Sequence, residues 1–208
     1  MTALFLKFDI QHYWHIGSGE EGGAYADSLV LKDSYQLPFI PGKSVKGLLR
    51  EAFNLAIDHG WYDKAQRDTL FGCEGVSLTN ASRLHISSAI LPSADYAHFV
   101  HNPSMTQALY HVIQQMSIDS NTGTTQQGSL RSTEVCVPMT LVAEVHLPDI
   151  NSADIDSVEI DSVEESHNDV FEIFQSIVPL ITHLGAKRHR GMGEVFVSVI
   201  PSHEICEA

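Results

Sequence analysis

Three glycines near the end of the chain bracket a short cationic segment, Gly185-Ala-Lys-Arg-His-Arg-Gly-Met-Gly193. An apolar helical pattern ends at the first glycine, and a Val/Phe-rich strand pattern follows the last one. Glycine tolerates positive φ and allows two backbones to approach closely, while cations and free amide N–H groups favour an anion. We therefore expect a loop that binds single-stranded nucleic acid, whose phosphates are evenly spaced. An exposed turn with solvated charges is the alternative.

The net charge argues at first against a nucleic-acid partner. The chain has 26 acidic and 12 basic residues, a formal net charge of −14. Residues 149–172 hold nine of the acids and no Lys or Arg, which leaves a net charge of −5 for the rest of the chain. Because local charge decides phosphate contact, this weakens the objection without removing it.

The length and the cysteine pattern bound the class of protein. A chain of 208 residues predicts one domain spanning 1–208, with an acidic and flexible insertion at 149–166 that contains a tandem repeat at 155–164. The three cysteines form no CxxC motif, which argues against a disulfide framework or zinc site and for a reducing compartment. No membrane-spanning run or signal-peptide pattern occurs, so we expect a cytoplasmic protein without a membrane partner.

Hydrophobic periodicity predicts a mixed α+β fold. Residues 4–11 alternate apolar and polar side chains like a half-buried strand, whereas the apolar positions at 45–57 have helical spacing after Ser44, the expected N-cap. The order of the expected elements fits a ferredoxin-like (RRM-like) sheet with loop insertions. The other expected elements are a short helix ending near residue 72, a strand at 85–91, a helix at 105–116, a thumb-like hairpin at 117–130, a strand at 137–147, a helix at 170–184 kinked at Pro179 and a strand at 194–200.

The segment Pro41-Gly-Lys-Ser44 invites comparison with a nucleotide-binding P-loop. That motif requires a glycine five residues before Gly42, where this chain has Leu37, so we reject nucleoside triphosphate hydrolysis. A helix N-terminus with nearby cations remains, and Lys46 and Arg50 share one face of the expected helix. Such a terminus favours a phosphate group, although a solvated helix start is an equal alternative.

The segment at 37–50, LPFIPGKSVKGLLR, resembles the signature of the RAMP superfamily of CRISPR effector subunits. The resemblance covers nearly the whole chain and is closest to the repeated backbone subunit of type III-A (Csm) complexes. Other resembling segments occur along the chain in the family's order. They are the first loop at 15–17, the segment at 26–33 that carries the nuclease aspartate, the middle strand at 83–89, the thumb at 118–130 and the glycine-rich loop at 185–193.

The resemblance implies a metal-dependent endoribonuclease subunit. Its partners would be CRISPR RNA, complementary single-stranded target RNA, further copies of itself in a helical filament and other type III effector subunits. Asp27 matches the catalytic aspartate, which would act with a transiently held divalent cation, Mg²⁺ or Mn²⁺. The expected RNA-binding residues are His15, Lys43, Ser44, Lys46, Arg50, Arg83, Arg131, Lys187, Arg188, His189 and Arg190.

The chain departs from the family pattern, and alternatives stay open. Lys43 and Ser120 stand where the family usually has Ser and Arg, and the acidic segment is not a family feature. A carboxylate at Asp27 can bind a hard cation or take a proton from the attacking oxygen, but a turn aspartate without catalytic function is the alternative. The chain would then be a non-catalytic RNA-binding scaffold. A third possibility is a metal-free nuclease that processes CRISPR RNA through a histidine.

Overall fold

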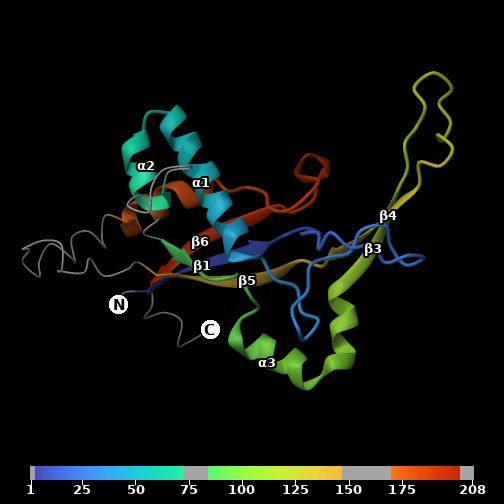
Figure 1. Ribbon diagram of the computed structural model, residues 1–208, viewed down its shortest axis with the longest axis horizontal. Coiled ribbons are helices and arrows are strands. Elements are labelled where there is room, and N and C mark those ends of the chain that lie inside the picture. Colours follow the sequence, from blue (N-terminus) through green and yellow to red (C-terminus); the bar gives the residue numbers. More distant parts are fainter. Residues whose placement is uncertain (1–2, 73–83, 147–169, 202–208) are drawn as a thin grey trace, which may run out of the picture.

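The main sheet of the protein contains four antiparallel strands (Figure 1). Their order in the sheet is β2 (His85–Ile86), β5 (Met139–His146), β1 (Ala3–Ile10) and β6 (Val195–Pro201). The computed structural model describes residues 3–72, 84–146 and 170–201. The fold is α+β, as predicted, and the β-α-β-β-α-β order of its core is consistent with a ferredoxin-like arrangement.

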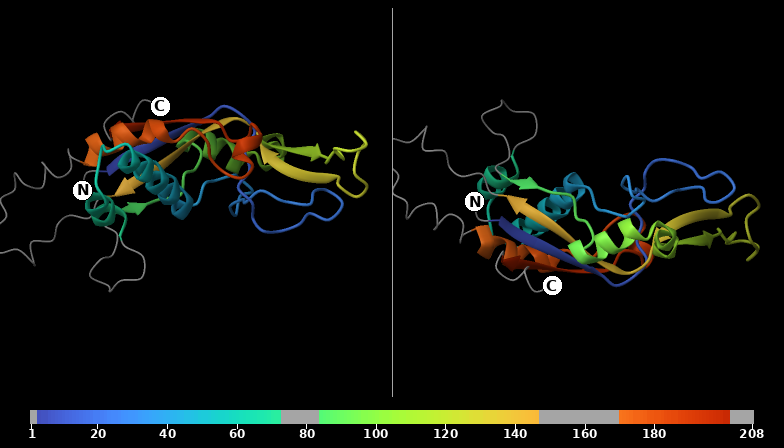
Figure 2. Two further views of the ribbon diagram at one scale, coloured as in Figure 1. Left: turned by 90° about the horizontal axis from the view of Figure 1, so that it is seen from above. Right: turned by 90° about the horizontal axis from the view of Figure 1, so that it is seen from below.

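The core lies between the sheet and two helices on one side of it (Figures 1 and 2). The alternation expected for the first strand is confirmed, because its inward-facing side chains are buried and pair in register with β5 and β6. Helix α1 (Gly42–Asp58) and a helix at 170–177 cover this face, whereas α3 (Ser93–His101) lies on the other side (Figure 2). The central buried side chains are Leu6, Phe8, Leu49, Phe53, Leu141, Phe174 and Ile177.

The prediction of a helix at 105–116 is wrong. A 3₁₀ helix, η2 (Pro103–Leu109), is followed there by strand β3 (Tyr110–Gln115). The strand pairs along its whole length with β4 (Arg131–Cys136), which provides backbone partners from a distant part of the chain. Long-range pairing has therefore overridden a local helical pattern.

Several expected boundaries also differ from the structure. The strand at 137–147 begins only at Met139, because Pro138 carries no N–H and separates β4 from β5. The strand at 85–91 continues past Ile86 only as isolated bridges. Helix α1 begins at Gly42 with Pro41 as its N-cap, so Ser44 is a helical residue and not the cap.

Strands β3 and β4 form a ribbon that protrudes from the main sheet (Figure 1). Residues 116–130 connect the two strands, with a bridge between Ile118 and Thr125 near the tip. The remaining short elements are α2 (Lys64–Phe71), η3 (Val178–Leu180) and η4 (Arg188–Arg190). The acidic segment at 149–166 and Arg83 lie outside the described residues. In the described part of the chain, no helix is long and apolar enough to span a membrane.

Candidate functional site

The first loop and the glycine-rich loop are joined through their backbones. Gly185 has a φ of +76°, and the N–H of Ala186 donates to the carbonyl oxygen of His15 at 2.8 Å. The imidazole of His15 is buried: its Nδ1 lies 2.7 Å from the carbonyl oxygen of Glu134, and its Nε2 lies 3.1 Å from the hydroxyl of Ser28. Both ring nitrogens of His15 therefore contact protein groups, and the side chain positions the loops.

Three distant segments line a cavity of about 500 Å³, which we call the groove cavity. It lies between the first loop, the exposed side of α1 and the glycine-rich loop. This arrangement brings predicted residues His15, Ser44 and Arg188 together at one cavity.

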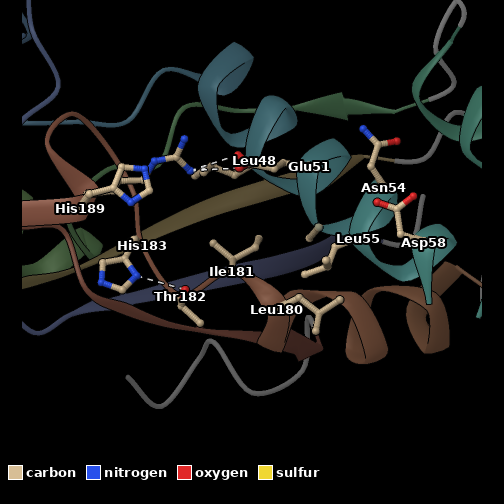
Figure 3. A pocket seen from close by; sticks show the side chains of 12 residues that line it. Leu48, Glu51, Asn54, Leu55, Asp58, Leu180, Ile181, Thr182, His183 and His189 are labelled. Carbon is tan, nitrogen blue, oxygen red and sulfur yellow. Dashed lines mark hydrogen bonds and ion pairs between the residues drawn. The ribbon is translucent and has the colours of Figure 1, made fainter.

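A second cavity, also of about 500 Å³, lies beside the first, and we call it the helix cavity (Figure 3). Its walls are the side of α1 that carries Glu51, Leu55 and Asp58 and the segment that carries His183 and His189 (Figure 3). Leu48, Glu51 and Arg188 line both cavities. The two cavities are therefore neighbours along one side of α1.

The cations of the glycine-rich loop point in different directions. The Nζ of Lys187 donates to the Thr133 hydroxyl at 2.8 Å and to the Gln115 side-chain oxygen at 3.1 Å, so it reaches the outer half of the β3–β4 ribbon, toward the 116–130 connection. Burial lowers the pKa of Lys187, and repulsion by Arg190 adds to this effect. Arg188 turns toward α1, where its Nη1 lies 3.1 Å from Oε2 of Glu51. His189 and Arg190 are exposed.

The predicted cations of α1 lie on another face of the helix. Burial lowers the pKa of Lys46, as does the nearby Arg50, so these two side chains share one flank as expected. Neither lines the groove cavity or the helix cavity, whose α1 residues include Ser44 and Glu51. At 3.6 residues per turn, Lys46 lies on nearly the opposite side of α1 from Ser44 and Glu51, and so points away from both cavities. The structure thus separates Lys46 and Arg50 from the groove, and Lys43 is exposed.

Asp27 is exposed and lies beside the outer half of β4, near the 116–130 connection. Its Oδ2 accepts hydrogen bonds from the backbone N–H of Ser132 at 2.6 Å and from the Ser132 hydroxyl at 3.2 Å. These two bonds lower the pKa of Asp27, and the positive charge of Arg131 adds to the shift. The lowered pKa favours the ionised carboxylate, and both Ser132 donors bond Oδ2. Arg131 also donates to the carbonyl oxygens of Gly128 and Leu130, within the ribbon.

The sequence did not identify the ion pair that anchors the loop carrying Asp27. Glu134 on β4 is buried, and its Oε1 lies 2.9 Å from the Nζ of Lys32 while its Oε2 accepts the N–H of Val30 at 3.0 Å. The Lys32 ammonium also lies 3.9 Å from the ring centroid of Tyr110. No local pattern indicates this pair, because the two residues are 102 positions apart.

The described residues contain no cluster of three His, Cys, Asp or Glu side chains that could hold a metal ion. Asp27 offers one carboxylate oxygen, Oδ1, that the Ser132 donors do not use. Mg²⁺ is commonly held by one or two carboxylates together with water and substrate phosphates. The described residues therefore fit a cation that binds jointly with RNA better than a metal site made of their side chains alone.

Comparison with known proteins gives a family and a fold. A family model described as the RAMP superfamily matches residues 7–196. The CRISPR system Cms endoribonuclease Csm3 of Enterococcus italicus is 34% identical over 102 residues, 45% of this chain and 48% of that protein, so the match spans about half the relative's length.

Two solved structures of type III-B Cmr-beta are similar in fold. The first, bound to cognate target RNA, has a TM-score of 0.63 at 12% identity and covers 95% of this chain and 96% of its own. The second, in the apo state, has a TM-score of 0.61 at 13% identity and covers 98% of both chains.

Proposed function

Because the chain belongs to the RAMP superfamily, we propose that it is a backbone subunit of a type III CRISPR effector complex that binds CRISPR RNA and cleaves complementary target RNA. The observation that carries this proposal is that an ionised carboxylate and a cation of the glycine-rich loop both bind strand β4. Asp27 is bound to Ser132, and Lys187 is bound to the adjacent residue Thr133. We infer that RNA bound along the glycine-rich loop reaches the edge of β4 at which Asp27 accepts the Ser132 N–H.

The chemistry of these groups suits phosphodiester cleavage. Lys187 and Arg131 carry positive charge near the outer half of the ribbon, where it would offset negative charge that develops on the phosphoryl oxygens. A divalent cation bound with the RNA would supply further charge compensation. Asp27 would hold that cation through Oδ1 or accept a proton from the attacking oxygen, and both roles require the ionised form that its lowered pKa provides.

Asp27→Asn tests the catalytic role without removing the local structure. An asparagine oxygen still accepts the Ser132 N–H bond, but the negative charge is lost. We expect cleavage of target RNA paired to the guide to fall by at least about 100-fold, while guide binding is retained. Asp95→Asn on the first turn of α3 is the matched control, because it removes the same charge from an exposed site far along the chain.

The alternative is a subunit that binds RNA without cleaving it, and it is favoured by the structural hydrogen bonds of Asp27 with Ser132. Target cleavage that survives Asp27→Asn would support this scaffold and assign cutting to another subunit. Cleavage of precursor RNA in chelator would instead indicate a metal-free processing nuclease. Purification from the host followed by sequencing of bound RNA separates all three from a protein without RNA, since each predicts small RNAs that share a repeat-derived end.

Assembly along the guide is a further part of the proposal. One guide segment per subunit requires head-to-tail contacts, which build an open helix and not a closed dimer. Mixing the purified subunit with RNAs of increasing length should give complexes whose mass rises in steps of one subunit. Complexes of constant mass would contradict the filament.

A further inference from the structure

Glu51 occupies an unexpected position between the two cavities. Its carboxylate lies on α1 and faces the glycine-rich loop, where Oε2 and Oε1 are 3.1 Å and 3.3 Å from Nη1 of Arg188 (Figure 3). Both residues line the groove cavity and the helix cavity. The ion pair therefore crosses the boundary between the cavities and connects two elements that are 137 residues apart.

The negative charge of Glu51 would repel the phosphates of an RNA strand in the groove cavity. Among the described residues that line the groove cavity, Glu51 is the one acidic side chain and Arg188 the one Lys or Arg. A carboxylate presents two anionic oxygens to a guanidinium, as a phosphate does. We propose that Glu51 is an internal competitor of RNA: it holds Arg188 in the free subunit and is exchanged for a phosphate of the bound strand.

The exposure of the pair makes this exchange easy. The Arg188 and Glu51 side chains are 39% and 63% exposed, and ion pairs between exposed groups contribute little to stability. A phosphate that reaches the groove can therefore displace the carboxylate at small cost. The same competition lowers the affinity for any RNA that contacts Arg188. Other contacts of the RNA must therefore supply the binding free energy that offsets the loss of the Glu51–Arg188 pair. This inference rests on the proposed function, because it assumes that RNA enters the groove.

The substitution Glu51→Gln tests the competition directly. It removes the charge but keeps the size of the side chain, and its exposed position leaves the core unchanged. We expect the purified subunit to bind a single-stranded RNA of fixed length about two- to fivefold more tightly than the wild type. The plot of log K against log salt concentration should steepen by about 0.7, because binding at Arg188 then releases a counterion without breaking an internal pair.

Two further variants make the result specific. Glu172→Gln removes an equal charge from an exposed site on the helix at 170–177, so it reports the effect of net charge alone. Arg188→Gln removes the proposed partner, and the gain from Glu51→Gln should disappear in that background. An equal gain in RNA affinity from Glu172→Gln, or an undiminished gain in the Arg188→Gln background, would overturn the proposed exchange. The effect of Glu51 would then be general repulsion between negative charges.

The outcomes also separate this inference from the proposed function. If the wild type binds RNA and Glu51→Gln binds it equally well with the same salt dependence, only the competition is refuted. If neither protein binds RNA while both unfold cooperatively at similar temperatures, the proposed function fails and the inference fails with it. Tighter binding that requires Arg188 supports both.

Discussion

Gly185 lies so close to the carbonyl oxygen of His15 that a Cβ at this glycine would collide with it. The neighbouring Ala186 N–H bonds the same oxygen, so the glycine-rich loop rests directly on the first loop. Close approach and the positive φ of Gly185 both depend on the missing side chain. This contact fixes one wall of the groove cavity relative to another.

Gly185→Ala should therefore destabilise the protein strongly. An alanine would have to adopt a left-handed conformation and push the His15 carbonyl away, and we expect a loss of about 3 kcal/mol or more in the free energy of unfolding. Urea denaturation measures the loss. Gly191→Ala is the control, because Gly191 has nearly the same φ, +75°, but open space around its Cβ position, so it should lose only about 1 kcal/mol. Equal losses at both positions would refute the close-contact argument.

His15 should make stability depend on pH. Burial lowers its pKa below the ordinary value of 6.5, and repulsion by Lys187 acts in the same direction, although the Glu134 carbonyl opposes the shift. Between the folded-state pKa and 6.5 the unfolded chain binds more protons, so the stabilisation is complete above pH 6.5 and is lost as the pH falls. Urea midpoints of the wild type and His15→Gln, measured from about pH 7.5 down to about pH 5, should converge toward acid pH. Parallel curves would show that His15 does not titrate differently on folding.

The sequence predicted those elements whose local pattern agrees with their tertiary environment. The alternation of residues 4–11 corresponds to β1, because one face of that strand is buried and the other is not. Residues 105–116 were misleading, since their apolar positions fit helical spacing, whereas the backbone partners of β3 come from β4. Local periodicity carries no information about such a partner.

The candidate site was predictable in its segments but not in its contacts. The first loop, the start of α1 and the glycine-rich loop, which the sequence singled out separately, meet at one cavity. The sequence could not show that Gly42, the glycine of the apparent phosphate-binding motif, instead permits close packing against the Ile86 carbonyl oxygen. It also could not show which face of α1 turns toward the groove, because Lys46 and Glu51 are both polar surface residues in the sequence.

Lys32→Met should lower the free energy of unfolding, because it leaves the buried carboxylate of Glu134 without its ion pair. Only 2% of the Glu134 side chain is exposed, and without the Lys32 ammonium its Oε1 loses the ion pair. We expect a loss of about 3 kcal/mol in the free energy of unfolding, measured with urea. Adding Glu134→Gln, which keeps an acceptor for the Val30 N–H, should restore much of that loss.

The exposed ion pair of the groove is the control for this prediction. Arg188→Gln breaks a pair of similar length, 3.1 Å, whose side chains are 39% and 63% exposed, and should cost less than about 1 kcal/mol. If Lys32→Met lowered the free energy of unfolding only as little as Arg188→Gln, the Lys32–Glu134 pair would not anchor the loop that carries Asp27.

Ser132→Ala should shift the titration of Asp27 without abolishing its ionisation. The pKa of Asp27 lies below the ordinary value of 3.8, first because the Ser132 N–H donates to it and second because the Ser132 hydroxyl does so. Alanine removes only the hydroxyl, so the pKa should rise but stay below 3.8, as measured by NMR titration of the carboxyl carbon. If ionised Asp27 drives cleavage, the activity that is lost as the pH falls should be lost at a higher pH in Ser132→Ala. An unchanged Asp27 pKa would mean that the hydroxyl does not stabilise the carboxylate, and a shifted pKa with an unchanged pH profile would favour the RNA-binding scaffold over the nuclease.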